Sequence, residues 1–246
     1  MNRVVFSRIV DIHLAGCGGN GCHILMGLCQ LQAAVRGLGH PGIHVTAWDP
    51  DNVSEANLGR QLFTQDELGQ NKAVTVITRA NIVFGLDWEA VPIAYRPSRA
   101  PDILISCVDS KQARATIHER VRQCARHYWM DLGNGPDYGQ VIFGETGKGK
   151  HRLPNVVDLY PEIIQGHEDN TPSCSLAEAL DRQELFVNRA LTAHALHILW
   201  TVFRRGEITL AGCFLNLREM TVAPIPARLT SQWKGKRLSP KANAAQ

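Results

Sequence analysis

The segment IVDIHLAGCGGNG, residues 9–21, decides the fold of this 246-residue chain. It begins with an apolar run that only Asp11 and His13 interrupt, and it ends in a glycine-rich turn. The residues that follow have the apolar spacing of a helix. The segment therefore predicts a strand, a tight turn and a helix from about Asn20 to Arg36.

Strands and helices continue to alternate through the first half of the chain. The run ILISCV, residues 103–108, is short and unbroken, as expected of a central strand covered on both faces. Other expected elements are strands at 43–48, 89–95 and 127–133 and helices at 71–84, with apolar spacing at Val74, Ile77 and Ile82, and at 111–126. This alternation predicts an α/β fold with a Rossmann-like, doubly wound and mostly parallel sheet.

The pattern changes after Gly133. A strand around 139–144, a long helix over 175–203 and two strands within 208–222 indicate late antiparallel pairing. We expect one domain over residues 1–226 with an irregular excursion at 147–173. A basic and flexible tail is expected at 227–246.

Composition excludes several classes of function. A net charge of +3 is too small to indicate nucleic acid or a membrane surface as partner. No signal peptide and no membrane-spanning run is found, so a cytoplasmic protein is expected. The seven cysteines are odd in number and form no C-x-x-C pair, so we expect neither a disulfide framework nor a structural zinc.

The glycine turn predicts a nucleotide site. Gly16, Gly18 and Gly21 form a G-x-G-x-x-G motif, with Gly19 as an additional glycine. Missing side chains let the backbone approach a phosphate, and the helix start presents free N–H groups to it. Asp49, at the end of the second strand, could accept hydrogen bonds from ribose hydroxyls. The alternative is a tight strand–helix junction without a ligand, and the motif does not choose between NAD and ATP.

The stretch WDPDNVSEANLGRQ, residues 48–61, favours a triphosphate. It places Asn57, Arg60 and Gln61 in one loop, and Lys72 follows in the first turn of the next helix. A cation there opposes the positive end of the helix dipole, and a bound anion would remove that penalty. Two cations near the glycine turn suit ATP better than a pyrophosphate, although each could also be a surface charge.

Asp109 is a candidate Mg²⁺ ligand. It follows ILISCV directly, at the carboxyl end of a central strand, where open parallel sheets bind ligands. Magnesium takes one or two protein carboxylates together with phosphate oxygens and water. Alternatively, Asp109 belongs to the cap of the helix that follows Ser110.

The four segments GCGGNG, WDPDNVSEANLGRQ, LGQNKA and ISCVDSKQAR resemble, in order and spacing, the motifs of the ThiF/MoeB family and of the related ubiquitin-activating enzymes. The match covers about residues 9–126. TPSCSLAEALDRQELFVNRALTAHAL, residues 171–196, is also similar to the ThiF-type member of PRTRC gene systems.

The resemblance implies that ATP and Mg²⁺ are used to adenylate the C-terminal carboxylate of a small ubiquitin-like or sulfur-carrier protein that ends in glycine. It also implies a homodimer. The positions that match the phosphate-binding turn are Gly16, Gly18, Gly19 and Gly21. The D-x-D element places Asp49 and Asp51 on the nucleotide, and the positions at the triphosphate are Asn57, Arg60, Gln61 and Lys72. Asp109 matches the metal ligand. Ser110 stands where an Asn usually follows the magnesium Asp.

Cys174 is a candidate nucleophile. It precedes an expected helix that Ser175 and Glu178 could cap, and a thiol at a helix start has a lowered pKa. Relatives carry a cysteine at this place, which implies a thioester or persulfide step after adenylation. The alternative is a small buried side chain. The other six cysteines are expected to pack in the core.

Three functions compete on these grounds. The first is the adenylating enzyme. The second is an NAD-dependent oxidoreductase on the same glycine turn, although no clear His or Tyr/Lys catalytic arrangement is found for it. The third is a module that binds the nucleotide or the carrier without turnover.

Overall fold

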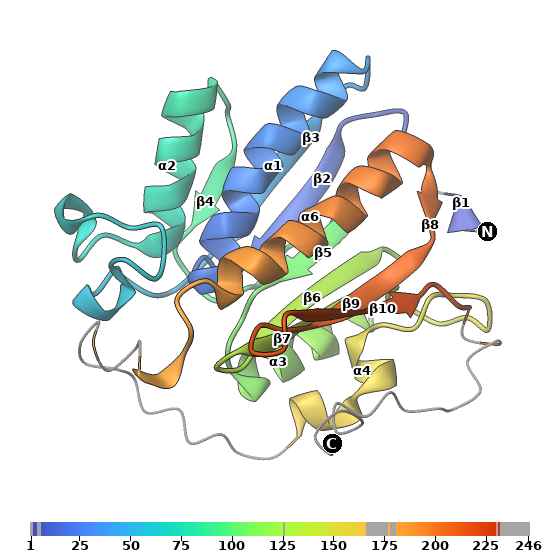
Figure 1. The fold of residues 1–246 in the computed structure, drawn as a ribbon. Coiled ribbons are helices and arrows are strands. Elements are labelled where there is room, and N and C mark those ends of the chain that lie inside the picture. Colours follow the sequence, from blue (N-terminus) through green and yellow to red (C-terminus); the bar gives the residue numbers. More distant parts are fainter. Residues whose placement is uncertain are drawn as a thin grey trace.

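An eight-stranded sheet runs through the computed structural model, which describes residues 2–3, 6–124, 126–165, 177, 181–229 and 231 (Figure 1). Its strand order is β10-β9-β7-β6-β5-β2-β3-β4. The parallel strands are β2 (Val10–Ala15), β3 (Ile43–Trp48), β4 (Glu89–Val91), β5 (Ile103–Ser106) and β6 (Tyr128–Asn134); β7 (Tyr138–Glu145), β9 (Leu210–Asn216) and β10 (Thr221–Pro226) pair antiparallel. The expected α/β class, with late antiparallel strands, is confirmed.

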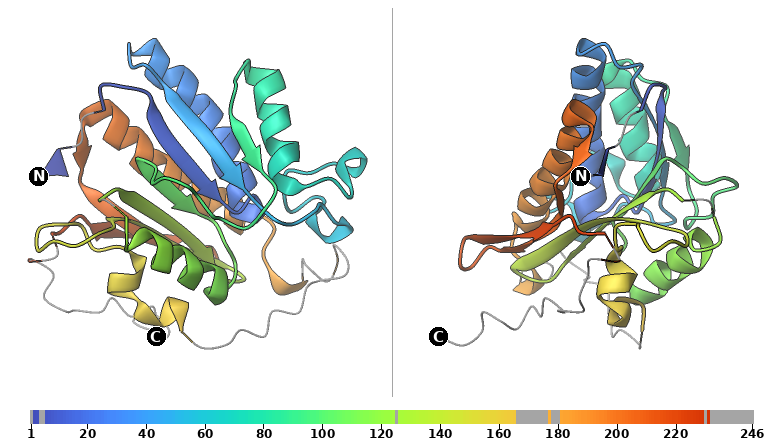
Figure 2. Two further views of the ribbon diagram at one scale, coloured as in Figure 1. Left: turned by 180° about the vertical axis from the view of Figure 1, so that it is seen from behind. Right: turned by 90° about the vertical axis from the view of Figure 1, so that its right-hand side faces the viewer.

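Helices cover both faces of this sheet (Figure 2). One face carries α1 (Gly19–Gly37), α2 (Lys72–Phe84) and α6 (Val187–Arg205), and the other carries α3 (Lys111–Val121), α4 (Val156–Leu159) and the 3-10 turn η3 (Pro161–Ile164). Two further 3-10 turns, η1 (Glu55–Asn57) and η2 (Gln65–Glu67), lie between β3 and α2, and β1 (Asn2–Arg3) pairs with β8 (Glu207–Ile208) outside the main sheet. In the described ranges no helix has the length and apolarity to cross a membrane.

The two polar residues within β2 have partners on the second face of the sheet. Val10, Ile12 and Leu14 belong to the core on the α1 side, so Asp11 and His13 point the other way. The loop after β4 brings Tyr95 to that side, where its hydroxyl lies 3.1 Å from His13 Nδ1. The strand therefore tolerates these interruptions because the second face supplies polar and aromatic neighbours.

Close contact between α1 and α6 brings the two helices side by side (Figure 1). A Cβ added at Gly27 would lie 2.0 Å from Cδ1 of Leu196, so a larger residue there would require the Leu196 side chain to move. The contact holds α6 beside the helix that begins at the glycine turn. The start of α6 thereby becomes part of the surroundings of that turn.

The buried face of α2 differs from the prediction. Val74 and Ile82 are 41% and 77% exposed, and only Ile77 of the three predicted apolar positions is buried. The buried face instead includes Ala73 and Ala80, both fully covered. Val76 and Ile77 also lie on the buried face, so the predicted apolar spacing identified only part of it.

Three predicted elements differ from the observed ones. The strand expected over 89–95 stops at Val91, because Pro92 has no N–H for the ladder. The helix expected to reach residue 126 ends at Val121. The helix expected over 175–203 is not continuous in its described part: residues 183–186 interrupt it and α6 begins at Val187, because Glu184 N donates to the carbonyl of Pro136.

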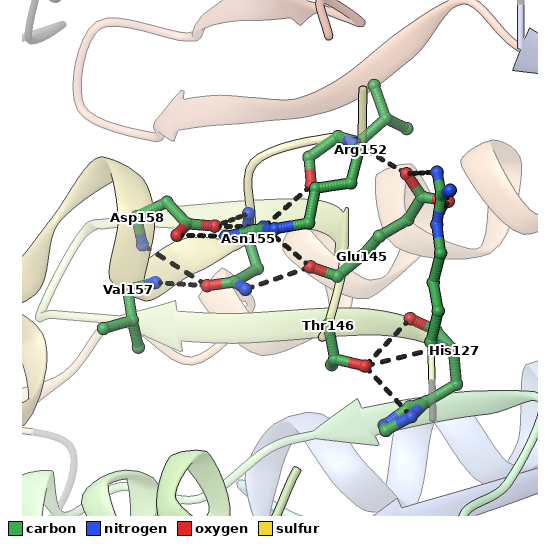
Figure 3. Close-up of polar contacts among 9 residues, drawn as sticks. His127, Glu145, Thr146, Arg152, Asn155, Val157 and Asp158 are labelled. Carbon is green, nitrogen blue, oxygen red and sulfur yellow. Dashed lines mark hydrogen bonds and ion pairs between the residues drawn. The ribbon is translucent and has the colours of Figure 1, made fainter. Parts of the chain in front are cut away.

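Charged and amide side chains fasten the described part of the excursion to the end of β7 (Figure 3). Arg126 donates to both carboxylate oxygens of Glu145 at 2.8 and 2.7 Å, and Asn155 Nδ2 donates to the Glu145 carbonyl. Arg152 forms a bidentate pair with Asp158 at 2.5 and 2.6 Å. The segment predicted to be irregular thus contains α4 and η3, and its residues 166–173 lie outside the described ranges.

We predict an acid-dependent loss of stability that depends on His13. Burial lowers the pKa of His13 to about 3, whereas the unfolded chain titrates near 6.5. Because only the unfolded chain then binds the proton, the free energy of unfolding falls as the pH drops below that value, by at most ~1.4 kcal/mol per pH unit. His13→Gln should flatten this dependence in urea titrations, and the exposed control His197→Gln should not. A wild-type slope in His13→Gln would contradict the prediction.

Candidate functional site

The glycine turn lies at the point where the strand order of the sheet reverses. In the sheet, β3 lies on one side of β2 and β5 lies on the other. Gly16 N donates to the carbonyl of Trp48 at 2.8 Å, and Cys107 N donates to the carbonyl of Ala15 at 2.8 Å. Crevices at such points, beyond the carboxyl ends of parallel strands, are the ligand sites of open α/β sheets.

Two of the four glycines are required by the turn itself. Gly16 has a φ of +92°, and an added Cβ would lie 2.7 Å from the carbonyl oxygen of Cys107. A Cβ at Gly21 would lie 1.9 Å from the carbonyl oxygen of Gly16. The tight junction considered from the sequence is therefore sufficient to explain these two positions.

Gly18 has no such requirement. The nearest atoms to an added Cβ are the amide atoms of Gln61, at 3.8 and 3.9 Å, which is ordinary contact. Gly18 is the N-cap of α1; no side chain of the described residues caps that helix start, and its first turn has no acidic residue. The unpaired N–H groups there favour an anion in front of Gly18.

Asp49 is bound to the turn. Its carboxylate is 4% exposed and accepts hydrogen bonds from Cys17 N at 2.6 Å and Asp51 N at 2.8 Å. Burial raises the pKa of Asp49, and these two hydrogen bonds act against that rise. The acid predicted for the ribose therefore also orders the loop that follows β3.

Lys72 lies at the first residue of α2, as predicted, and is 8% exposed. Its Nζ lies 3.1 Å from a carboxylate oxygen of Asp51, so the anion that offsets the helix dipole in this structure is the second acid of the D-x-D element. Asn71 caps α2 and donates its amide to the carbonyls of Asp49 and Asp51. This network holds Lys72 beside the glycine turn.

Arg60 and Gln61 leave two buried polar atoms for a ligand. Arg60 Nη1 donates to Gln183 Oε1 at 2.5 Å, but Arg60 Nε is buried and finds no hydrogen-bond partner among the described residues. The same holds for Gln61 Oε1. Burial lowers the pKa of Arg60, and the negative charge of nearby Asp109 acts in the opposite direction. Buried polar atoms without partners are uncommon and call for an explanation.

Asn57 stabilises the loop that follows β3. It is buried, and its Oδ1 accepts a hydrogen bond from Ser54 N at 3.0 Å, which closes a capping box around η1. Among the described residues, no hydrogen bond or ion pair joins Asn57 to the glycine turn. Its predicted contact with the triphosphate stays a prediction.

Asp109 lies three residues beyond β5 and is exposed. Ser110, rather than Asp109, caps α3 by accepting from Ala113 N at 3.1 Å. Asp109 is therefore available for a ligand and lies within electrostatic reach of Arg60. The described ranges hold no group of three or more His, Cys, Asp and Glu side chains that could bind a metal, so Mg²⁺ would need phosphate oxygens besides this carboxylate.

The thiols around the turn are poor candidates for a nucleophile. Burial raises the pKa of Cys17 and Cys107, and that of Cys22 to about 11. These cysteines pack, as predicted. Cys174 lies outside the described residues.

Four amide side chains near the turn were not predicted from the sequence. Asn20 lies inside the glycine motif and is buried, and its amide meets side chains from the end of β6 and the start of α6. The four are Asn20, Asn134, Gln183 and Asn188. A buried Asn within a helix start was the one available signal, since the other three come from distant segments.

The geometry thus brings the glycine turn, Asp49, Gln61 and Lys72 together and places Arg60 near Asp109. A helix start at the switch point of the sheet, with the buried Lys72 and the half-buried Arg60 nearby, is the arrangement of a nucleotide-binding α/β domain. The ThiF family model matches residues 7–233, and the chain belongs to the ThiF family. It carries a ThiF/E1-like adenylation domain.

Known relatives agree in fold. The chain is similar to mouse (Mus musculus) ubiquitin-like modifier-activating enzyme 6, at 26% identity over 179 residues, which is 68% of this chain and 16% of that enzyme. Escherichia coli MccB solved with MccA superposes with a TM-score of 0.62 at 16% identity, covering 89% of this chain and 64% of MccB. MccB solved with ATP gives a TM-score of 0.58 at 17% identity with the same coverage, and PaaA gives 0.59 at 15%, covering 88% of this chain and 72% of PaaA. The chain thus spans a small part of the mouse enzyme and just under two thirds of MccB.

We predict different effects for alanine at two of the glycines. Gly16→Ala should destabilise the fold by about 1–3 kcal/mol, because of its positive φ and the contact with Cys107. Gly18→Ala should unfold at a temperature close to that of the wild type but lose affinity for ATP, because its methyl group enters the space left for a phosphate. Thermal denaturation and calorimetry measure the two effects. Undiminished ATP binding in Gly18→Ala would contradict this assignment.

Proposed function

We propose that this chain uses ATP to adenylate the C-terminal carboxylate of a small ubiquitin-like or sulfur-carrier protein that ends in glycine. The observation that carries the proposal is the half-buried Arg60 next to Gln61, with its buried Nε unpartnered among the described residues. A desolvated cation without an anion is unfavourable, and a triphosphate supplies the anion.

Each element of the site has a role in this reaction. The start of α1 and the turn at Gly18 bind phosphate oxygens through backbone N–H groups. Asp49 accepts two N–H groups and retains lone pairs for ribose hydroxyls. Arg60 and Lys72 neutralise charge that develops on the phosphates, and Lys72 would leave the exposed Asp51 to do so.

The chemistry needs no protein nucleophile for its first step. The incoming carboxylate oxygen attacks the α-phosphorus, a new P–O bond forms, and the bond to pyrophosphate breaks. The residues of this chain align the reactants and stabilise charge. Bound Mg²⁺, held by Asp109 and phosphate oxygens, would supply further charge neutralisation.

Two features favour this function over an oxidoreductase. NAD carries a pyrophosphate that backbone N–H groups neutralise, and the half-buried Arg60 together with the buried Lys72 exceeds that need. The related MccB has been solved with ATP and with MccA, and the mouse relative is named for activating a ubiquitin-like modifier. We further propose a cytoplasmic homodimer that belongs to a PRTRC gene system.

We predict carrier-dependent exchange of labelled pyrophosphate into ATP. The probe is a small ubiquitin-like protein with a free C-terminal glycine encoded by a neighbouring gene. Arg60→Ala and Asp109→Ala should each lower the exchange rate by about 10²-fold or more, because each removes charge stabilisation at the phosphates. The exposed control Asp87→Ala should exchange like the wild type.

The carrier lacking its terminal glycine should give no exchange. Full exchange by Asp109→Ala would contradict the proposed metal site, and no exchange by the wild type would contradict the proposed activity. ATP binding without exchange would favour a non-catalytic module, and tight NAD binding an oxidoreductase.

We also propose that Cys174 accepts the carrier after adenylation. Its thiolate would attack the acyl-adenylate carbonyl, form a C–S bond and release AMP. Cys174→Ala should keep the exchange reaction but lose a thiol-cleavable adduct with the carrier, seen by intact-mass spectrometry. Cys124→Ala, at the end of α3, is the matched control and should keep the adduct. An adduct that persists in Cys174→Ala would assign Cys174 to packing.

A further inference from the structure

A chain of side-chain amides runs from Arg60 to the glycine motif. Arg60 Nη1 donates to Gln183 Oε1 at 2.5 Å, and Gln183 Nε2 donates to Asn188 Oδ1 at 3.3 Å. Asn188 Nδ2 donates to Oδ1 of Asn20 at 2.9 Å and of Asn134 at 3.0 Å. We call Gln183, Asn188, Asn20 and Asn134 the amide chain. It joins the loop after β3, the start of α6, the start of α1 and the end of β6.

The charge of Arg60 sets the direction of the amide chain. A guanidinium has only donors, so Gln183 must turn its carbonyl oxygen toward Arg60 and its NH₂ toward Asn188. Asn188 must then present its oxygen to Gln183 and its NH₂ to Asn20 and Asn134. Every carbonyl thus points toward the cation, which stabilises Arg60 in one orientation.

Gly19 shows that the glycine motif is built around this chain. A Cβ at Gly19 would lie 2.7 to 2.9 Å from the three amide-group atoms of Asn188. Asn188 is 3% exposed and Asn20 is 6% exposed, so neither side chain can move into solvent without losing its partners. The close approach of Asn188 is by itself a sufficient reason for the additional glycine of GCGGNG.

We infer that Gln183 and Asn188 are positioning residues for the nucleotide, an inference that rests on the proposed function. They hold the guanidinium by Nη1, which leaves the buried Nε of Arg60 as the donor for phosphate. Through them the start of α6, more than 120 residues from Arg60, sets the affinity for ATP. Neither residue belongs to the segments of the D-x-D or glycine motifs.

The test compares nucleotide binding by calorimetry. Gln183→Glu keeps the shape of the side chain but places a carboxylate on Arg60, so ATP should bind about tenfold more weakly or worse, while adenosine binds as to the wild type. Gln183→Met, which removes the acceptor without adding charge, should weaken ATP binding by a smaller factor. Gln30→Glu, an exposed site on α1, is the matched control and should bind ATP like the wild type.

A second measurement needs no nucleotide. Gly19→Ala should lower the melting temperature strongly in the wild-type background and much less in the Asn188→Ala background, because the methyl group then meets no amide. Additive effects of the two substitutions would overturn the amide chain.

The outcomes separate the two proposals. Wild-type ATP binding that Gln183→Glu leaves unchanged would overturn the positioning role and leave the adenylation proposal standing. A wild type that binds no ATP would overturn the proposed function and the positioning role with it. Equal weakening of ATP and adenosine binding by Gln183→Glu would show a merely structural effect, and would also overturn the positioning role.

Discussion

Backbone packs directly on backbone where β2 turns into α1. A Cβ at Gly16 would lie 2.7 Å from the carbonyl oxygen of Cys107, and a Cβ at Gly21 would lie only 1.9 Å from the carbonyl oxygen of Gly16. No side chain fits in either place, so the first turn of α1 packs closely against the ends of β2 and β5. The helix start, with its unpaired N–H groups, therefore lies in the crevice where the strand order reverses. The rest of the site is arranged around that position.

The surroundings of the turn combine extensive burial with high polarity. Asp49, Lys72 and Asn188 are each more than nine-tenths covered, and each has a specific partner. Arg60 Nε and Gln61 Oε1 are the exceptions among the site atoms in the described ranges. A buried polar atom without a partner is unfavourable, so these two atoms are candidate contacts for a ligand beside the turn.

Much of this could be predicted from the sequence. The glycine spacing after an apolar run and the alternation of elements are local patterns, so they predicted the strand, turn and helix order and the α/β class. The position of Lys72 at a helix start followed in the same way. Predictions were wrong where a distant segment decided the outcome. Val74 and Ile82 are exposed although Ile77 of the same predicted spacing is buried, and the long helix expected from residue 175 is interrupted where Glu184 N donates to the carbonyl of Pro136.

The sequence by itself determined which residues form the turn, the D-x-D loop and the strand ends, because these depend on neighbours a few positions away. Only the tertiary structure decided which side chains surround them. Asn188 lies 168 positions from Asn20, and no local pattern reports that contact. It arises because Gly27 lets α6 lie close against α1, which brings the start of α6 to the glycine turn. Packing between helices that are far apart in the chain therefore completes a site whose other residues lie in short continuous segments of the sequence.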